Sequence, residues 1–239
     1  MLRTFFMARS NRIRLAIGTP TTGNVRIEYM ESVLNMQQAL LSDPRLKVDV
    51  VKLLFYCSSV IPKNRHKIVD MARNMKATHI LWIDDDMKFP PLAAKALIHG
   101  MLKNPEIKIL GANCIKRLYP IEFMATYHDD TEVNSYEKEG IEKVRYTGNS
   151  FVLMDMSIFD TVPLPWFAFA WHAHSGDFGT EDVFFMATAA QHGIDTYVDH
   201  DVSKLIDHIG IHRFQPQDIE GRGKKEYGGN TPMRRSHGE

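Results

Sequence analysis

The sequence of 239 residues predicts an α/β protein in which an open, mostly parallel sheet is covered by helices in one domain. Two observations lead to this expectation. In the first half, short apolar runs rich in Val, Ile and Leu alternate with longer segments whose apolar residues recur with the helical period. In the second half, shorter runs flank a polar hairpin, which adds a small antiparallel part. A chain of this length is sufficient for one sizeable core.

The first half is predicted to follow the order β-α-β-α-β-α-β. Asn24 caps the first helix, Asp43 and Pro44 end it, and Pro62 opens the second. Ligands of such sheets bind beyond the carboxyl ends of the strands, where a turn at 18–23 and the end of the third strand both fall. The expected strands are 14–18, 48–56, 79–83 and 107–114, and the expected helices are 25–42, 62–75 and 92–102.

The second half is predicted to contain further strands and one helix, which Thr180 caps and Gly193 ends. After His212 the chain is polar, so we expect one domain over 1–212 and a polar tail over 213–239. The expected strands are 122–127, 143–147, 148–156, 194–198 and 202–209, with a polar hairpin at 129–140, a run rich in proline and aromatic residues at 162–171, and the helix at 181–191.

Composition and charge limit the classes of function. The 29 Lys and Arg residues balance 29 Asp and Glu residues, so net charge does not indicate a nucleic-acid or membrane-surface binder. Two cysteines, Cys57 and Cys114, lie in apolar settings typical of free thiols in a reducing compartment. No run has the apolar length of a signal peptide or a membrane span. We therefore expect a cytoplasmic protein without stable membrane insertion.

Three consecutive carboxylates, Asp84, Asp85 and Asp86, follow the apolar third strand. Side chains alternate along an extended chain, so Asp84 and Asp86 are expected to point the same way and Asp85 the other way. Two adjacent carboxylates repel each other unless a cation lies between them. Hard oxygen ligands suit Mg²⁺ or Mn²⁺, and these ions in turn suit a diphosphate. A solvated acidic turn is the alternative.

Four segments, taken in order, carry a resemblance to a known family. They are ILWIDDDMKFP (80–90), YTGNSFVLMDMSIFDTVPLPWF (146–167), GTEDVFFMATAAQHGIDTYVD (179–199) and LIDHIG (205–210). Together they resemble the GT-A class of nucleotide-sugar glycosyltransferases, particularly its small bacterial and phage members, over most of 13–212. The resemblance implies a single Rossmann-like GT-A domain of hexosyltransferase type. It would move a sugar from a nucleoside-diphosphate sugar to an acceptor hydroxyl with Mn²⁺ or Mg²⁺.

The resemblance also implies a set of metal ligands. Asp84 and Asp86 match the Asp-x-Asp motif: Asp86 would ligate the metal, and Asp84 would ligate it or face the ribose or a metal-bound water. Asp85 could share either role, because all three positions are Asp. His208 matches a late histidine that is a further metal ligand in many such enzymes, and imidazole suits Mn²⁺ better than Mg²⁺. A structural histidine is the alternative reading of His208.

Asp182 and Glu181 are the candidate catalytic residues. When a sugar–phosphate bond breaks, negative charge builds on the departing diphosphate, and a divalent ion stabilises it. The acceptor hydroxyl must lose a proton, for which Asp182 is the candidate general base. Glu181 beside it would bind the acceptor or the donor sugar. The alternative is that both are ordinary carboxylates in the first turn of a helix, where they complement the helix dipole.

Other side chains are candidate contacts to the nucleotide or the sugar. Thr19 lies in the predicted turn, which lacks the Gly-Lys-Ser/Thr of a Walker motif and is expected to contact the base or ribose through its backbone. Arg65, Lys116 and Arg117 are candidates for the diphosphate, with solvated surface charge as the alternative. The aromatic residues of 162–171 offer flat faces to a sugar ring, although core packing competes for each; they are Trp166, Phe167, Phe169 and Trp171.

Two other classes of function remain open. A metal-dependent nucleotidyltransferase or phosphohydrolase also uses paired Asp on a parallel sheet, but usually needs more acidic ligands for two metals. A non-catalytic nucleotide- or carbohydrate-binding protein is the other class. For a transferase, the expected partners are a UDP or GDP sugar and an acceptor that is a glycan, a lipid-linked sugar, a protein or a modified DNA base. The balanced charge gives the DNA acceptor no support.

Overall fold

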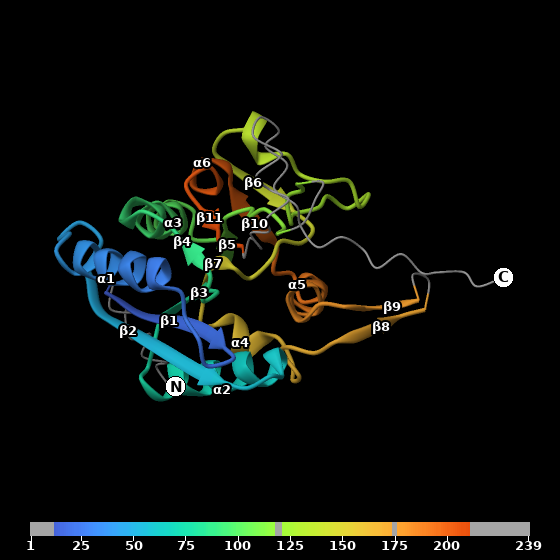
Figure 1. Cartoon of the computed structure of the whole chain (residues 1–239), viewed down its shortest axis with the longest axis horizontal. Helices are drawn as coiled ribbons and strands as arrows, with labels where there is room; N and C mark the ends of the chain where they lie inside the picture. The colour runs from blue at the N-terminus through green and yellow to red at the C-terminus, as the bar shows by residue number, and fades with distance from the viewer. Residues whose placement is uncertain (1–11, 118–120, 174–175, 211–239) are drawn as a thin grey trace, which may run out of the picture.

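A computed structural model describes residues 12–117, 121–173 and 176–210, and its centre is a seven-stranded sheet (Figure 1). Across the sheet the strands are β2 (Val48–Cys57), β1 (Ile13–Thr21), β3 (His79–Ile83), β7 (Phe151–Asp155), β5 (Ile109–Gly111), β10 (Thr196–Asp199) and β6 (Ile141–Val144). β7 and β6 run antiparallel to their neighbours, and the other strands are parallel to one another. This is the mostly parallel, Rossmann-like α/β architecture that the sequence predicts.

Helices cover both faces of this sheet (Figure 1). One face packs against α1 (Ile27–Leu41) and α3 (Pro91–Lys103), and the other against α2 (Ile61–Asn74), α4 (Ile158–Thr161) and α5 (Glu181–Gln191). Along β3, Leu81 and Ile83 join the first core, whereas Ile80 and Trp82 join the second, because side chains alternate along a strand. A strand covered on both sides is apolar throughout, which made 79–83 recognisable in the sequence.

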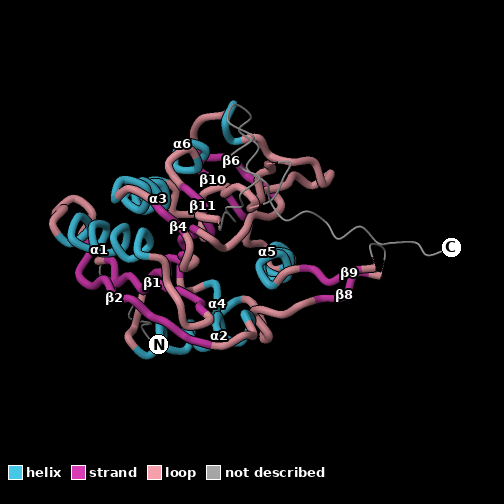
Figure 2. The backbone as a smooth tube through the Cα atoms, viewed as in Figure 1, coloured by secondary structure: helices cyan, strands magenta, loops and turns pink. Residues whose placement is uncertain are grey.

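Two small antiparallel sheets lie outside the central one (Figure 2). β4 (Met87–Lys88) pairs with β11 (Asp207–His208), which holds the last described part of the chain beside the segment that follows β3. β8 (Ala170–His172) pairs with β9 (Asp177–Gly179), and these two strands form an arm that extends from the body next to α5. We call this pair the β8–β9 arm.

The structure confirms the fold class and corrects several boundaries. β1 continues through 18–21, where a turn was predicted, because β2 pairs with it as far as Thr21 and this pairing overrides the turn propensity of Gly, Thr and Pro. The predicted strand at 122–127 contains only isolated bridges. The predicted strand at 202–209 holds the end of α6 (His200–Ser203) and β11. The tail predicted at 213–239 lies outside the described residues.

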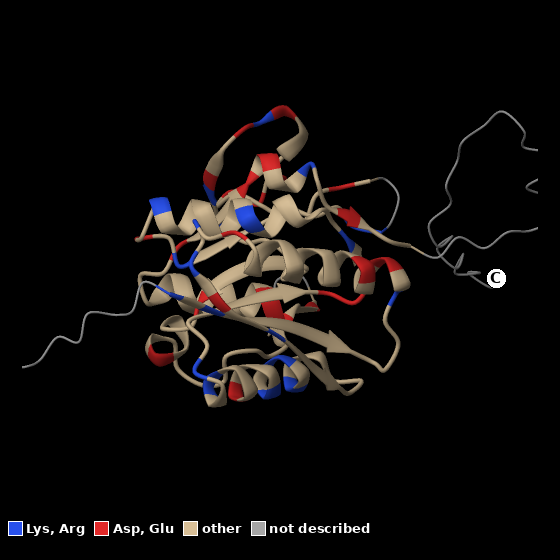
Figure 3. Ribbon diagram, turned by 90° about the vertical axis from the view of Figure 1, so that its left-hand side faces the viewer, with Lys and Arg blue, Asp and Glu red and all other residues tan. Residues whose placement is uncertain are grey.

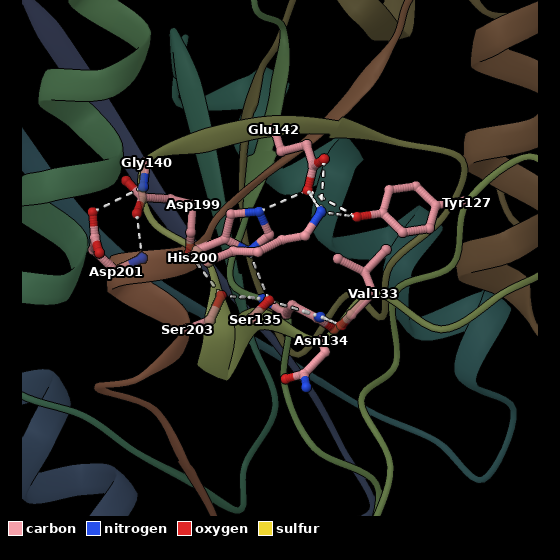
Figure 4. A network of polar contacts seen from close by, with 12 residues as sticks. Tyr127, Val133, Asn134, Ser135, Gly140, Glu142, Asp199, His200, Asp201 and Ser203 are labelled. Carbon is pink, nitrogen blue, oxygen red and sulfur yellow. Dashed lines mark hydrogen bonds and ion pairs between the residues drawn. The ribbon is translucent and has the colours of Figure 1, made fainter.

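A polar network centred on the buried His200 attaches the long 113–146 segment to the far end of the sheet (Figure 4). The His200 ring is almost fully buried, with Nδ1 2.9 Å from Ser135 Oγ and Nε2 2.9 Å from Glu142 Oε2. Glu142 also accepts hydrogen bonds from Lys138 and Tyr127. The apolar cluster of this region is small, so we infer that the network provides much of the order there.

The described surface carries charges of both signs. Figure 3 shows Lys and Arg positions interspersed with Asp and Glu positions on the face that it presents. Among the described helices, none is both long and apolar enough to cross a membrane.

Gly18 is required by close packing within β1. A Cβ atom at this position would lie 2.8 Å from two ring carbons of Trp82 and 2.9 Å from Ile68 Cγ2. Since Trp82 is fully buried, its ring has no free space into which to move. Glycine at position 18 therefore allows the Trp82 side chain of β3 to pack directly against the backbone of β1.

We expect Gly18→Ala to destabilise the fold by about 1–3 kcal/mol, the usual cost of overpacking a core. Gly210→Ala is the matched control, because nothing lies within 4 Å of a Cβ at that position. Urea unfolding followed by circular dichroism measures both. Equal midpoints for the two variants would show that the contact with Trp82 does not constrain Gly18.

Candidate functional site

A cleft of about 380 Å³ lies at the carboxyl ends of β1, β2 and β3. The amino end of α5, the residue before β7 and the end of β11 complete its walls. Parallel α/β sheets bind ligands at this edge. Among the residues predicted to catalyse the reaction or to contact the metal or the nucleotide, only Thr19 and Lys116 do not line the cleft. Those that line it are Arg65, Asp84, Asp85, Asp86, Arg117, Glu181, Asp182 and His208.

A larger cavity of about 920 Å³ lies at the opposite edge of the sheet. It contains none of the predicted site residues, and its charges pair locally, as in the bridges of Arg12 to Asp49 and of Lys108 to Asp155. The smaller cleft brings together the three aspartates, the carboxylates at the start of α5 and His208 at the edge where such sheets bind ligands, so we take it as the candidate site.

The three aspartates lie in a turn and not in an extended strand. β3 ends at Ile83, and the Met87 N–H donates to the Asp84 carbonyl oxygen over 3.3 Å. The alternation expected of an extended chain therefore does not apply here. The three carboxylates line one cleft, but each contacts a different set of partners.

Asp84 belongs to a buried ionic cluster organised by Arg65. Arg65 is 1% exposed and donates from Nε to Glu181 Oε1 over 2.7 Å and from Nη2 to Asp84 Oδ1 over 3.3 Å. Its guanidinium lies over the Trp82 ring, 5.1 Å from the ring centroid. Ser150 donates to the second Asp84 oxygen over 2.9 Å. Both Asp84 oxygens thus accept a hydrogen bond from the protein, and the role of Asp84 as a metal ligand stays a prediction.

Burial governs the acidity of this cluster. It raises the pKa of Asp84, although the charge of Arg65 and the hydrogen bond from Ser150 act in the opposite direction. Burial by itself would lower the pKa of Arg65, but the charges of Asp84 and Glu181 outweigh it and raise that pKa, so Arg65 stays cationic. Arg65 Nη1 and Asn64 Oδ1 are buried without a hydrogen-bond partner, and both residues line the cleft. The wall therefore retains one unused donor and one unused acceptor.

Asp86 faces a histidine and an arginine. Its Oδ1 lies 3.4 Å from His208 Nε2, and its Oδ2 lies 2.5 Å from Arg117 Nη1. Burial alone would raise the pKa of Asp86, but the hydrogen bond and charge of His208 and the charge of Arg117 outweigh it and lower that pKa. Burial would likewise lower the pKa of His208, but the contacts with Asp86 and with the Ile115 carbonyl outweigh it and raise that pKa.

Asp86 and His208 have the chemistry of a metal-binding pair. The His208 Nδ1–H donates to the Ile115 carbonyl over 2.8 Å, which leaves Nε2 facing Asp86, as in the outer-shell arrangement of ligating histidines. Among the described residues, no group of three or more His, Cys, Asp and Glu side chains is arranged to hold a metal. Ions that bind diphosphates often take only one or two protein ligands, with phosphate and water completing the shell. The pair therefore fits Mn²⁺ shared with a diphosphate.

Asp85 and the end of β1 form a second wall. Burial raises the pKa of Asp85, partly offset by a hydrogen bond from Thr21. Thr19, predicted to contact the nucleotide, is fully buried with its hydroxyl bonded to Tyr29, and it does not line the cleft. This prediction is corrected, because β1 extends further than expected. Thr21 and Thr22 take the position at the cleft that was expected of Thr19.

The amino end of α5 gives its two carboxylates different surroundings. Glu181 is 5% exposed and ion-paired with Arg65, so it orients that guanidinium, where sugar binding was predicted. Asp182 is partly exposed and lines the cleft. Its Oδ1 accepts a hydrogen bond from the Thr180 hydroxyl, and its Oδ2 lies 3.4 Å from the backbone nitrogen of Asn149, which donates to it. Thr180 occupies the N-cap position, but its side chain holds Asp182 instead of capping the helix.

Sequence reasoning missed the contribution of 147–150. Ser150 binds Asp84, and the Asn149 N–H lies beside Asp182. Polar residues were sought after apolar strands, since parallel strands bring their carboxyl ends to the site. β7 is antiparallel to β3, so its amino end reaches the same edge. The signal was present as the polar run Thr-Gly-Asn-Ser directly before the apolar strand.

The aromatic residues predicted to stack on sugar divide into two groups. Trp166 and Phe167 are 5% and 2% exposed and belong to the core between the sheet, α2 and α5, which corrects their prediction as sugar contacts. Phe169 and Trp171 are exposed, the latter on the β8–β9 arm. Only the second group is available to a ligand.

Comparison with known proteins bears on the fold. The structure is similar to the crystal structure of A197 from STIV, with a TM-score of 0.52 and 16% sequence identity over 78% of this chain and 81% of that chain. Altogether 187 chains of solved structures match. At this identity the similarity concerns the fold alone. No family model matches the sequence, and no curated protein matches it.

We expect Arg65→Met to destabilise the protein by about 3–5 kcal/mol, because it leaves Glu181 buried without its partner. In the double variant Arg65→Met/Glu181→Met, most of that loss should be recovered, since the uncompensated charge is gone. Lys67→Met on the same helix is the control, because its ion pair to Asp70 is exposed. Glu181→Met completes the double-mutant cycle, and denaturant unfolding measures all four variants. Strictly additive losses in the double variant would contradict a coupled pair.

Proposed function

We propose that this chain is a metal-dependent glycosyltransferase that moves a sugar from a nucleoside-diphosphate sugar to an acceptor hydroxyl. The observation that carries the proposal is the convergence of Asp86, Asp182 and His208 with two arginines in one cleft at the ligand-binding edge of the sheet. A metal-bound diphosphate needs hard ligands and cations. An acceptor hydroxyl needs a carboxylate within reach. These requirements are met by different walls of the same cleft.

The donor diphosphate would be held by charge. Asp86 and His208 would hold Mn²⁺ or Mg²⁺, which stabilises negative charge on the departing diphosphate. Arg117 is beside Asp86 on the cleft wall and can donate to phosphate oxygens. The unpartnered Nη1 of Arg65 is a second donor. The UDP and GDP types of donor are the first candidates.

Asp182 is the proposed general base. It lies in the first turn of α5, where the helix field favours the ionised carboxylate. The Thr180 hydroxyl and the Asn149 N–H orient its two oxygens. The same field that keeps Asp182 ionised also lowers its basicity, so its catalytic contribution would come from its position next to the acceptor.

The other two classes of function receive less support. A two-metal phosphohydrolase or nucleotidyltransferase needs several acidic ligands together, and among the described side chains no such group of three exists. A binding protein without catalysis would have no need for a positioned carboxylate at 182 beside the paired acids and cations. We therefore retain the transferase as the proposal.

The first test concerns the metal. UDP and GDP should bind more tightly with Mn²⁺ than with EDTA, and Asp86→Ala and His208→Ala should each abolish that difference. Asp207→Asn, an exposed carboxylate next to His208, should leave it unchanged. Isothermal titration calorimetry gives the affinities, and thermal unfolding confirms that the variants are folded. Undiminished Mn²⁺-dependent binding in Asp86→Ala would remove Asp86 from the metal site.

The second test concerns Asp182. In Asp182→Asn, nucleotide and Mn²⁺ binding should be retained, while sugar transfer falls by about 10²–10⁴-fold, the usual contribution of a general base. Asp195→Asn, which removes an exposed carboxylate elsewhere, is the control. Loss of nucleotide binding in Asp182→Asn would assign the residue to the donor pocket. Undiminished transfer would favour a mechanism without an enzymatic base.

A further inference from the structure

The β8–β9 arm exposes an aromatic pair that the core does not use. Trp171 and Phe178 are directly opposite in the register of the two strands, so they share a face, and their ring centroids are 5.1 Å apart. They are 58% and 62% exposed, and Phe169, just before the arm, is 51% exposed. Large aromatic side chains grouped in water are costly unless a partner covers them, so such a group marks an interaction surface.

The arm leads directly to the cleft. β9 ends at Gly179, and the next residues, Thr180, Glu181 and Asp182, line the cleft. Only Gly179 separates Phe178 from Thr180, so their Cα atoms are at most about 7 Å apart along an extended chain. Figure 1 shows the arm extending outward from α5, whose amino end directly follows β9. A chain-like ligand on the aromatic pair would therefore continue toward Asp182.

Charge decides which kind of ligand fits. The sequence has no Lys or Arg between Arg145 and Lys204, a stretch that includes the whole arm. Carboxylates do occur near the pair, at Asp177 and in the first turn of α5. Nucleic acids and anionic lipid surfaces are bound through Lys and Arg. The arm is therefore unsuited to a polyanion, whereas a neutral ligand meets no opposing charge there.

We propose that the β8–β9 arm is a stacking platform for a neutral oligosaccharide. Flat indole and phenyl faces pack against the C–H faces of sugar rings, and this contact needs no charge on either side. Since sugar units are linked in a chain, one unit on Trp171 and Phe178 places the next units toward the cleft. This glycan is then the acceptor of the transfer reaction, and that part of the inference rests on the proposed function.

Tryptophan fluorescence reports binding without any donor or metal. Of the three tryptophans, Trp82 and Trp166 are buried, so quenching by acrylamide acts mainly on Trp171. Neutral oligosaccharides of glucose, galactose or mannose should protect Trp171 from quenching, whereas duplex DNA and anionic phospholipid vesicles should not. The platform is overturned if no neutral oligosaccharide protects Trp171, or if DNA, vesicles or a second copy of the chain, seen by sedimentation, protects it instead.

Calorimetry with the protecting oligosaccharide then tests the residues. Trp171→Ala and Phe178→Ala should each weaken binding about tenfold or more, as truncated aromatic hot spots do. Tyr136→Ala is the control, because it removes a highly exposed aromatic ring from η1 (Ser135–Glu137), outside the arm. Equal affinities for the arm variants and this control would overturn the proposal.

The acceptor role has a separate readout. With a nucleotide sugar and Mn²⁺, the arm variants should hydrolyse the donor at the wild-type rate but transfer sugar to the oligosaccharide at least tenfold more slowly. Transfer that is unaffected by the arm variants overturns the acceptor role and leaves the transferase standing. Oligosaccharide binding by a protein that shows neither hydrolysis nor transfer supports the platform and overturns the proposed function.

Discussion

The ion pairs of Arg65 with Glu181 and Asp84 are the interaction on which the candidate site depends. Removing an ion from water costs several kcal/mol, and this cost is offset only when the geometry is good and the remaining polar atoms are satisfied. Here two of the three guanidinium nitrogens donate to carboxylates and the group lies over Trp82, which offsets part of the cost, whereas Nη1 has no partner. The cluster joins α2, the end of β3 and the start of α5. The positions of these three parts of the cleft are therefore coupled to one another.

The cost of burying charge also explains why the three neighbouring aspartates have different partners. Three adjacent aspartates could not all remain ionised in one partly buried place without compensation. The protein itself neutralises Asp84 through Arg65 and Ser150, and Asp85 turns to Thr21. Asp86 is left facing His208 and Arg117 at the cleft, where an external cation can compete for it. A motif of three identical residues thus becomes three chemically distinct positions, because each faces a different element.

Two strand pairings bring the remaining groups to this edge. β7 lies between β3 and β5 and is antiparallel to both, so the polar residues at its amino end reach Asp84 and Asp182. β11 pairs with β4, which follows the aspartate turn, and this register places His208 opposite Met87, the residue after Asp86. Neither pairing connects segments that are close in sequence. Long-range register decides the site, and local propensity does not.

The sequence by itself determined the alternation of strands and helices, the buried strand at 79–83, the aspartates after it and the carboxylates at the start of α5. These features have local signals, since periodicity and helix-end chemistry depend on neighbouring residues. Only the tertiary structure decided that β1 continues past Gly18, that Thr19 is buried, that Glu181 pairs with Arg65 and that Trp166 and Phe167 belong to the core while Trp171 is exposed. The physical reason is that burial and ion pairing depend on which surfaces meet across the sheet. That information is not contained in any single segment of the chain.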